Sequence, residues 1–169
     1  MILRELNLHD KVAFEELLDV WDGAFGYSLL YEVMAEKKFE NYLKLMNEMS
    51  RGINLPENHV PSTNLFAFDE NVIVGKVSVR HHLNENLENV GGHIGYAVLP
   101  EHRKKGYASE MLKQVLSYCN QLGLHRVLVT CNENNIASAK VILKNGGVLE
   151  NIFDPKDGTS KKLRYWIQI

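Results

Sequence analysis

Three basic residues, Arg103, Lys104 and Lys105, precede Gly106 in the second half of the chain. A largely apolar stretch comes before them and ends at Pro100, and apolar residues recur at three- and four-residue spacing after the glycine. This order predicts a buried strand, a basic loop and an amphipathic helix. The free amides and the positive dipole end of a helix N-terminus favour an anion. The loop is therefore a candidate phosphate site, although an ordinary solvated loop has the same local features.

Histidines close to this loop in sequence are candidates for proton transfer. His93 lies in the predicted strand before the loop, and His81 and His82 lie near the end of the preceding strand. An ordinary imidazole titrates near 6.5 and can act as a base at neutral pH. A strand histidine can equally be a structural hydrogen-bonding group. Arg80, next to this strand end, could pair with a carboxylate or could be surface charge.

The elements that must position these residues follow from hydrophobic periodicity. Residues 92–99 predict a strand, residues 107–122 a helix that stops at Gly123, residues 125–131 a second strand, and residues 136–144 a further helix. A strand, helix and strand in this order require a right-handed crossover between parallel strands.

The rest of the chain adds antiparallel hairpins and more helices. Strands are predicted at 1–6, 65–68, 72–83, 148–153 and 163–169, helices at 12–21 and 30–49, a surface loop at 53–64 and a polar connection at 84–90. The long helix at 30–49 has an apolar stripe that fits core packing or the wall of a substrate cleft. Together these elements predict a mixed sheet with helices packed on its faces.

Length and composition limit the classes of protein. The 169 residues predict a single domain over 1–169, with 45% hydrophobic and 24% charged residues and a formal charge of −2. This charge gives no general attraction to nucleic acid or membranes. The N-terminus is too polar for a signal peptide, and no apolar run could span a bilayer, so we expect a cytoplasmic protein. Cys119 and Cys131 lie in apolar segments, which favours buried free thiols over a disulfide or a metal site.

The loop and its neighbours resemble a known family. The pattern Arg/Gln-x-x-Gly-x-Gly/Ala is present as Arg103-x-x-Gly106-x-Ala108, and Asn135 with Ser138 leads the helix that follows the next strand. This arrangement resembles the GNAT superfamily of acyl-CoA-dependent N-acetyltransferases, specifically from about residue 75 to the C-terminus. The wording Arg80-His81-x-Leu83-Asn84 and Gly91-Gly92-His93-Ile94-Gly95-Tyr96 resembles a bacterial subgroup of predicted acetyltransferases with unassigned substrates.

The resemblance implies an α+β fold of the three-layer type. Its sheet would be mixed and mostly antiparallel, with a central splayed pair of parallel strands and helices on both faces. Acetyl-CoA would be the cosubstrate, its pyrophosphate on the amides of residues 104–109 and its pantetheine arm on the open edge of the first parallel strand. The residues implied in CoA binding are Tyr96, Ala97, Val98, Arg103, Lys104, Lys105, Gly106, Tyr107, Ala108, Ser109, Asn135 and Ser138. Asn135 could also simply cap its helix.

The implied reaction is direct acetyl transfer to a primary amine of a small molecule or a peptide N-terminus. An alkylammonium has a pKa near 10.4, so a base must help remove a proton, and His93 is the candidate. The amide near Val98 would stabilise the oxyanion. Arg80 and His81 are candidate contacts to the acceptor. No metal is implied, and a homodimer is possible by analogy with relatives.

One position departs from the family pattern. Many members have a tyrosine seven residues after the asparagine, which protonates the departing CoA thiolate, but this chain has Ile142 there. Tyr107, Ser138 or a water could donate instead, or no donor is needed, because a thiol with a pKa near 8.5 leaves well as thiolate. The departure keeps open a non-catalytic acyl-CoA-binding sensor or interaction module. Nucleic-acid phosphate is a further candidate ligand of the basic loop, although no wider basic patch is visible.

Overall fold

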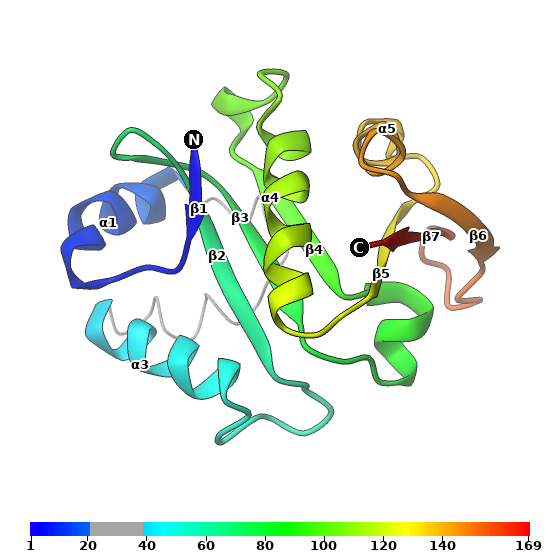
Figure 1. Cartoon of the computed structure of the whole chain (residues 1–169), viewed down its shortest axis with the longest axis horizontal. Helices are drawn as coiled ribbons and strands as arrows, with labels where there is room; N and C mark the ends of the chain where they lie inside the picture. Colours follow the sequence, from blue (N-terminus) through cyan, green and yellow to red (C-terminus); the bar gives the residue numbers. More distant parts are fainter. Residues whose placement is uncertain (21–38) are drawn as a thin grey trace.

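The computed structural model describes residues 1–20 and 39–169. These residues form a seven-stranded sheet in the order β1-β2-β3-β4-β5-β7-β6 (Figure 1). The strands are β1 (Ile2–Arg4), β2 (Ser62–Asp69), β3 (Val72–Arg80), β4 (Ile94–Val98), β5 (Arg126–Asn132), β6 (Val148–Phe153) and β7 (Lys162–Gln168). Neighbouring strands are antiparallel except β4 and β5, which are parallel. The mixed, mostly antiparallel sheet predicted from the sequence is confirmed.

Helices cover both faces of the sheet and bury two apolar clusters. On one face, α4 (Tyr107–Gln121) and α5 (Ile136–Lys144) pack against the larger cluster, and α4 crosses in front of the central strands in Figure 1. On the other face, α1 (Lys11–Val20) and α3 (Phe39–Ser50) pack against a smaller, aromatic cluster. Met111, Leu112 and Ile142 are fully buried in the larger cluster. Each such side chain contributes roughly 1.5–3 kcal/mol of burial free energy.

The two parallel strands separate soon after they meet. The register between β4 and β5 contains the pair Ile94 and Val129, whereas β4 pairs with β3 along all five of its residues. Beyond Ile94, the two strands, which the structure describes completely, have no further paired residues. The central pair is therefore splayed toward the carboxyl ends of both strands, as the family resemblance implied.

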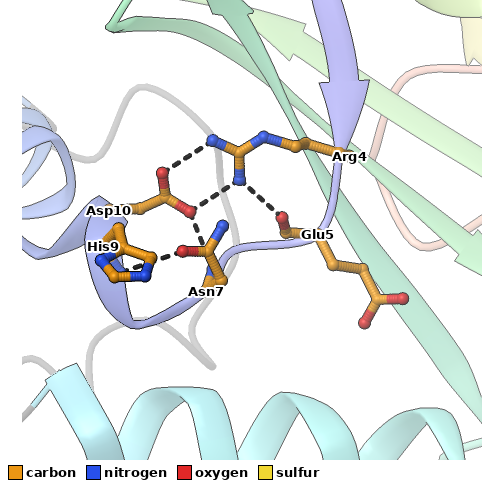
Figure 2. Close-up of polar contacts among 5 residues, drawn as sticks. All are labelled: Arg4, Glu5, Asn7, His9 and Asp10. Atoms are coloured by element: carbon orange, nitrogen blue, oxygen red, sulfur yellow. Dashed lines mark hydrogen bonds and ion pairs between the residues drawn. The ribbon is translucent and has the colours of Figure 1, made fainter.

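A polar cluster fixes β1 to the 3-10 turn Leu8–Asp10, which leads directly into α1 (Figure 2). The Arg4 guanidinium donates two hydrogen bonds to the Asp10 carboxylate, at 2.6 and 2.7 Å, and lies 4.0 Å from the centre of the Phe68 ring. Asp10 also accepts from the backbone N–H of Asn7, whose side chain accepts from the His9 N–H, so the pair forms a capping box. Arg4 holds the pKa of Asp10 below its ordinary value.

Several boundaries differ from the sequence prediction. β2 begins at Ser62, three residues before the predicted strand, because Thr63 and Asn64 are buried although their types suggested a loop. β3 ends at Arg80 rather than at residue 83, and β1 is shorter than predicted. The connection at 84–90 contains a π-helical turn, Leu87–Gly91, and a 3-10 turn, Pro100–His102, follows β4. The end of the first predicted helix and the start of the second lie outside the described residues.

Cys119 and Cys131 are buried free thiols, as predicted. No helix within residues 1–20 and 39–169 has the length and hydrophobicity that a membrane span requires.

Candidate functional site

A cavity of about 840 Å³ opens beside the splayed strands. Its walls come from β4, from the loop and first turn of α4, and from the end of β5 with the start of α5. Eleven of the twelve residues that the sequence assigned to CoA binding line it, and the exception is Lys105. Those eleven are Tyr96, Ala97, Val98, Arg103, Lys104, Gly106, Tyr107, Ala108, Ser109, Asn135 and Ser138. The fold thus brings three separate segments of the chain to one concave surface.

The basic loop gives the cavity one electropositive end. Lys104 and Gly106 have left-handed backbone conformations, with φ of 62° and 89°, so the chain turns sharply before α4. Gly106 caps α4 without a side-chain hydrogen bond. The N–H groups of Tyr107 and Ala108, in the first helical turn, have no acceptor within the helix by its geometry. Loop N–H groups, the helix dipole and two cationic side chains therefore suit an anion such as phosphate.

One of the predicted phosphate-binding amides is already used. The backbone N–H of Ser109 donates to the Gly106 carbonyl at 3.1 Å, so the free amides are those before residue 109. The Ser109 hydroxyl accepts a hydrogen bond from the Asn145 side chain at 3.2 Å, which ties α4 to the end of α5.

Alternate residues of β4 direct their backbone N–H and carbonyl groups toward the cavity. The Leu99 N–H donates to the Val74 carbonyl, and the His93 carbonyl accepts from the Arg80 N–H, whereas the His93 N–H, just before β4, donates to the Leu128 carbonyl of β5. Within β4, the odd-numbered residues therefore direct their N–H and carbonyl groups toward β3. Because the direction alternates along a strand, Tyr96 and Val98 direct theirs toward β5, where the pairing has ended at Ile94. The Val98 carbonyl accepts from Arg103 Nε at 3.1 Å. The remaining groups on this edge, which are the Val98 N–H and the Tyr96 N–H and carbonyl, can bond to an extended ligand as an added strand would.

The start of α5 closes the other side of the cavity. The Asn135 side-chain oxygen accepts from the Ser138 N–H at 3.0 Å, so Asn135 is the N-cap of α5 and also lines the cavity. This cap leaves the Asn135 NH₂ group for a ligand, and the two roles left open by the sequence are compatible. The Tyr96 hydroxyl lies 2.8 Å from the Ser138 hydroxyl, which bridges β4 and α5 across the cavity.

The side chain of Tyr107 is fixed by a hydrogen bond from its hydroxyl group. Its hydroxyl donates to the carboxylate of Asp69, the last residue of β2. This hydrogen bond is the main cause that raises the pKa of Tyr107. Because its hydroxyl is directed to Asp69, Tyr107 is not positioned to donate a proton to a thiolate at the β4 end of the cavity.

His93 is a buried residue that is hydrogen-bonded between the two parallel strands. Only 7% of the residue is exposed, and it does not line the cavity. Its Nδ1 accepts a hydrogen bond from the Leu128 backbone N–H at 2.9 Å, so that lone pair is occupied. Burial, followed by the charges of Arg80 and Arg126, lowers the pKa of His93 to about 4. The imidazole is neutral at pH 7 and bridges the parallel strands where they meet.

Arg80 and His81 lie on opposite faces of the sheet. Thr63 lies 2.9 Å from His81 Nε2 and accepts a hydrogen bond from Tyr118 of α4, so His81 packs on the α4 face. Arg80 follows the alternation of β3 to the face of α3. On that face, burial and then the charge of Arg80 lower the pKa of Lys76 to about 7. The structure does not bring Arg80 and His81 together as one acceptor site.

Sequence reasoning missed part of the cavity wall. His102, Asn132, Ala137 and Val141 also line it. Val141 is three residues after Ser138 on α5, and Ala137 is four residues before Val141, so helical spacing from Ser138 identifies Val141 and, through it, Ala137. Asn132 ends β5 beside the splay, a position that the parallel crossover predicts. His102 had no signal beyond its place in the basic loop.

The chain matches a family model described as Acetyltransferase (GNAT) domain over residues 1–148. Two relatives from Bacillus subtilis are similar in sequence. The uncharacterized N-acetyltransferase YnaD is 33% identical over 86 residues, which are 50% of this chain and 48% of the relative. The uncharacterized N-acetyltransferase YoaA is 40% identical over 60 residues, which are 35% of this chain and 34% of the relative. These alignments span about half of the first relative's length and a third of the second's.

Solved structures share the fold over nearly the whole chain. A ribosomal L7/L12 α-N-protein acetyltransferase, RimL, in complex with coenzyme A superimposes with a TM-score of 0.70 at 17% identity, covering 99% of this chain and 93% of that one. A mutant spermidine N-acetyltransferase SpeG from Vibrio cholerae superimposes with a TM-score of 0.63 at 18% identity, covering 99% and 95%. At these identities the likeness establishes the fold alone.

Proposed function

Because the chain belongs to the GNAT acetyltransferase family, we propose that it transfers an acetyl group from acetyl-CoA to a primary amine. The observation that supports this most strongly is one continuous cavity that joins the basic loop, the open edge of β4 and the start of α5. Its volume of about 840 Å³ is in the range of small-molecule sites, and its electropositive end suits a pyrophosphate.

We propose that the pyrophosphate binds the amides of residues 104–108 with Arg103 and Lys104. The pantetheine arm then extends along Tyr96 to Val98 toward the point where β4 and β5 pair, and the Asn135 NH₂ group contacts it from α5. This places the thioester at the end of the cavity far from the loop. The Val98 or Tyr96 N–H, both directed toward β5, can stabilise the oxyanion of the tetrahedral intermediate.

The acceptor amine approaches the thioester from the sheet face of Arg80, because α4 and α5 cover the other face. Arg80 is the proposed acceptor contact on this face. We do not assign the role of general base to His93, since protonation of its Nδ1 would break the hydrogen bond that this atom accepts from the Leu128 N–H. An amine that arrives neutral, or that loses its proton to water, meets the same requirement.

The test is incubation of the protein with acetyl-CoA and a panel of primary amines that includes polyamines, amino acids and peptides with free N-termini. Release of the CoA thiol is followed by a colorimetric thiol reagent, and the acetylated amine is identified by mass spectrometry. We expect at least one amine to accept the acetyl group. Tight CoA binding without turnover on any amine in the panel would instead support the non-catalytic acyl-CoA sensor.

A further inference from the structure

Two hydroxyl groups face each other across the cavity at the level of the splayed strands. The Tyr96 hydroxyl, from β4, lies 2.8 Å from the Ser138 hydroxyl and donates a hydrogen bond to the Ser138 carbonyl oxygen at 3.3 Å, both on α5. Both residues line the cavity. The fold brings them together from positions 42 residues apart.

This pair lies at the reactive end of the proposed cosubstrate. The basic loop and the first turn of α4 form the opposite end of the cavity, and the strands close the sheet at Ile94 and Val129. A pantetheine arm that runs from the loop along β4 reaches Tyr96 last, since Tyr96 is the lining residue nearest the closed pair in sequence. Its terminal sulfur then lies next to the Tyr96 side chain.

Neither Ile142 nor Tyr107 can take the role of the tyrosine that many family members carry on this helix. Ile142, at that position, is fully buried and packs in the main apolar cluster rather than lining the cavity. The hydroxyl of Tyr107 is directed away to Asp69. In the described part of the cavity wall, the hydroxyl groups of Tyr96 and Ser138 are therefore the candidates to donate a hydrogen bond to a leaving sulfur at this end.

We infer that Tyr96 donates a hydrogen bond to the CoA thiolate as it leaves, and that Ser138 orients the Tyr96 hydroxyl for this purpose. The inference rests on the proposed function. In the structure the Tyr96 hydroxyl donates to the Ser138 carbonyl at 3.3 Å, a long hydrogen bond. While the Ser138 hydroxyl donates to the Tyr96 oxygen, rotation of the phenolic hydrogen exchanges this long bond for one to the thiolate. Tyr96 is the catalytic residue in this assignment, and Ser138 is a positioning residue.

The step balances without another reactant. The amine nitrogen forms a bond to the thioester carbonyl carbon, the C–S bond breaks, and the sulfur keeps the electron pair. The nitrogen loses its proton to solvent, and the thiolate afterwards takes a proton from solvent. Tyr96 keeps its own proton and stabilises the negative charge on sulfur through the hydrogen bond.

The magnitudes favour a hydrogen bond over full proton transfer. Burial raises the pKa of Tyr96 to about 12. An ordinary thiol has a pKa near 8.5, so a thiolate takes a proton from such a phenol only against a difference of roughly 3.5 pKa units. The same high pKa keeps the Tyr96 hydroxyl protonated, and able to donate, throughout the physiological range.

The first test measures the ionisation of CoA bound to the protein, which needs no acceptor amine. Thiolate absorbance is titrated against pH for CoA bound to the wild type and to Tyr96→Phe, with the S-methyl-CoA complex as reference. Loss of the donated hydrogen bond should raise the thiol pKa of bound CoA by about one unit. Tyr42→Phe is the matched control, because Tyr42 is buried in the aromatic cluster on the opposite face. It should leave the thiol pKa unchanged.

The second test uses an amine that the wild type acetylates. Tyr96→Phe should lower kcat by about 10- to 100-fold while CoA affinity changes less than about threefold. Ser138→Ala should show part of this loss, and Ser138→Thr, which keeps the hydroxyl, should recover it. An unchanged thiol pKa in Tyr96→Phe would overturn the inference, as would tighter CoA binding with unchanged kcat, which would mean that the pair merely blocks the cavity. A wild type that does not bind CoA would instead overturn the proposed function itself.

Discussion

The hydroxyl oxygen of Tyr96 on β4 lies 2.8 Å from that of Ser138 on α5, one helical turn before Ile142. The side chain of Ile142 is buried in the main cluster, against which Tyr96 also packs. The polar function at this level of the cavity is thus supplied by a strand residue, and the helix position that many relatives use for a tyrosine is used here for packing.

Ile142→Tyr should destabilise the protein rather than create a new proton donor. A methyl group added at Gly147 would clash with Ile142 Cγ2, which shows how closely the two positions pack. Overpacking of such a site costs about 1–3 kcal/mol. Urea unfolding would measure the loss. Ile142→Val, which only removes a methylene, should lose about 0.5–1.5 kcal/mol. If Ile142→Tyr were as stable as the wild type and turned over faster, this packing role would be contradicted.

His93 should affect stability as a function of pH. Its pKa is about 4 in the folded protein and near 6.5 in the unfolded chain, so the unfolded state binds more protons between these values. The stability from neutral His93 is therefore fully present above pH 6.5 and is lost as the pH falls toward 4. The asparagine oxygen in His93→Asn can accept from the Leu128 N–H but does not titrate. This variant should therefore have a denaturation midpoint that depends less on pH across this window.

Substitutions of His93 also distinguish a structural role of this residue from a catalytic one. His93→Ala leaves the Leu128 N–H without its acceptor and should cost about 1–3 kcal/mol of stability. We expect kcat of the folded variant to stay within about threefold of the wild type, because the hydrogen bond that it removes is structural. A roughly 100-fold lower kcat in His93→Asn, at wild-type stability, would contradict this and support His93 as the base.

Much of the fold could be predicted because its signals are local. The helices at 107–121 and 136–144 follow clear 3.6-residue periodicity, and a left-handed glycine follows each of them, at Gly123 and Gly146. The hairpins follow from alternation around polar turns. The π-helical turn at 87–91 has no such pattern and was missed, as was the burial of Thr63 and Asn64.

The candidate site likewise contains residues that the sequence could predict and contacts that it could not. The basic loop and Asn135 were recognisable because their spacing along the chain is fixed. The partners of His93 and Tyr96 could not be predicted, since Leu128 and Ser138 are 35 and 42 residues away and the contacts depend on how the strands splay. His93 and His81 were both plausible bases in sequence, and only their hydrogen bonds distinguish a structural role.

Two adjacent lysines should differ in their effect on CoA affinity. Lys104 lines the cavity, whereas Lys105 does not. Lys104→Gln removes a charge that can bond to phosphate and should weaken CoA binding by about tenfold. Lys105→Gln should change it by less than about threefold at roughly 0.1 M salt, since Lys105 is exposed outside the cavity wall and salt screens exposed charges. Calorimetric titration measures both, and equal losses would indicate that the loop attracts CoA only through its total charge.

Two glycines at opposite ends of α4 provide the most direct test of the central claim that this cavity binds CoA. Gly106 and Gly123 both have left-handed conformations, with φ of 89° and 80°, and an added Cβ meets no atom within 4 Å at either position. A side chain at either position should therefore cost a similar strain of about 1–2 kcal/mol in the backbone. Of the two glycines, Gly106 lies in the cavity wall and Gly123 does not.

The measurement is the dissociation constant of CoA, by calorimetry, for the wild type, Gly106→Glu and Gly123→Glu. A carboxylate at Gly106 would face the pyrophosphate, so we predict that Gly106→Glu weakens CoA binding by at least about 100-fold. Gly123→Glu, with a similar loss of stability, should bind CoA as the wild type does. Equal affinity of the two folded variants would contradict the account.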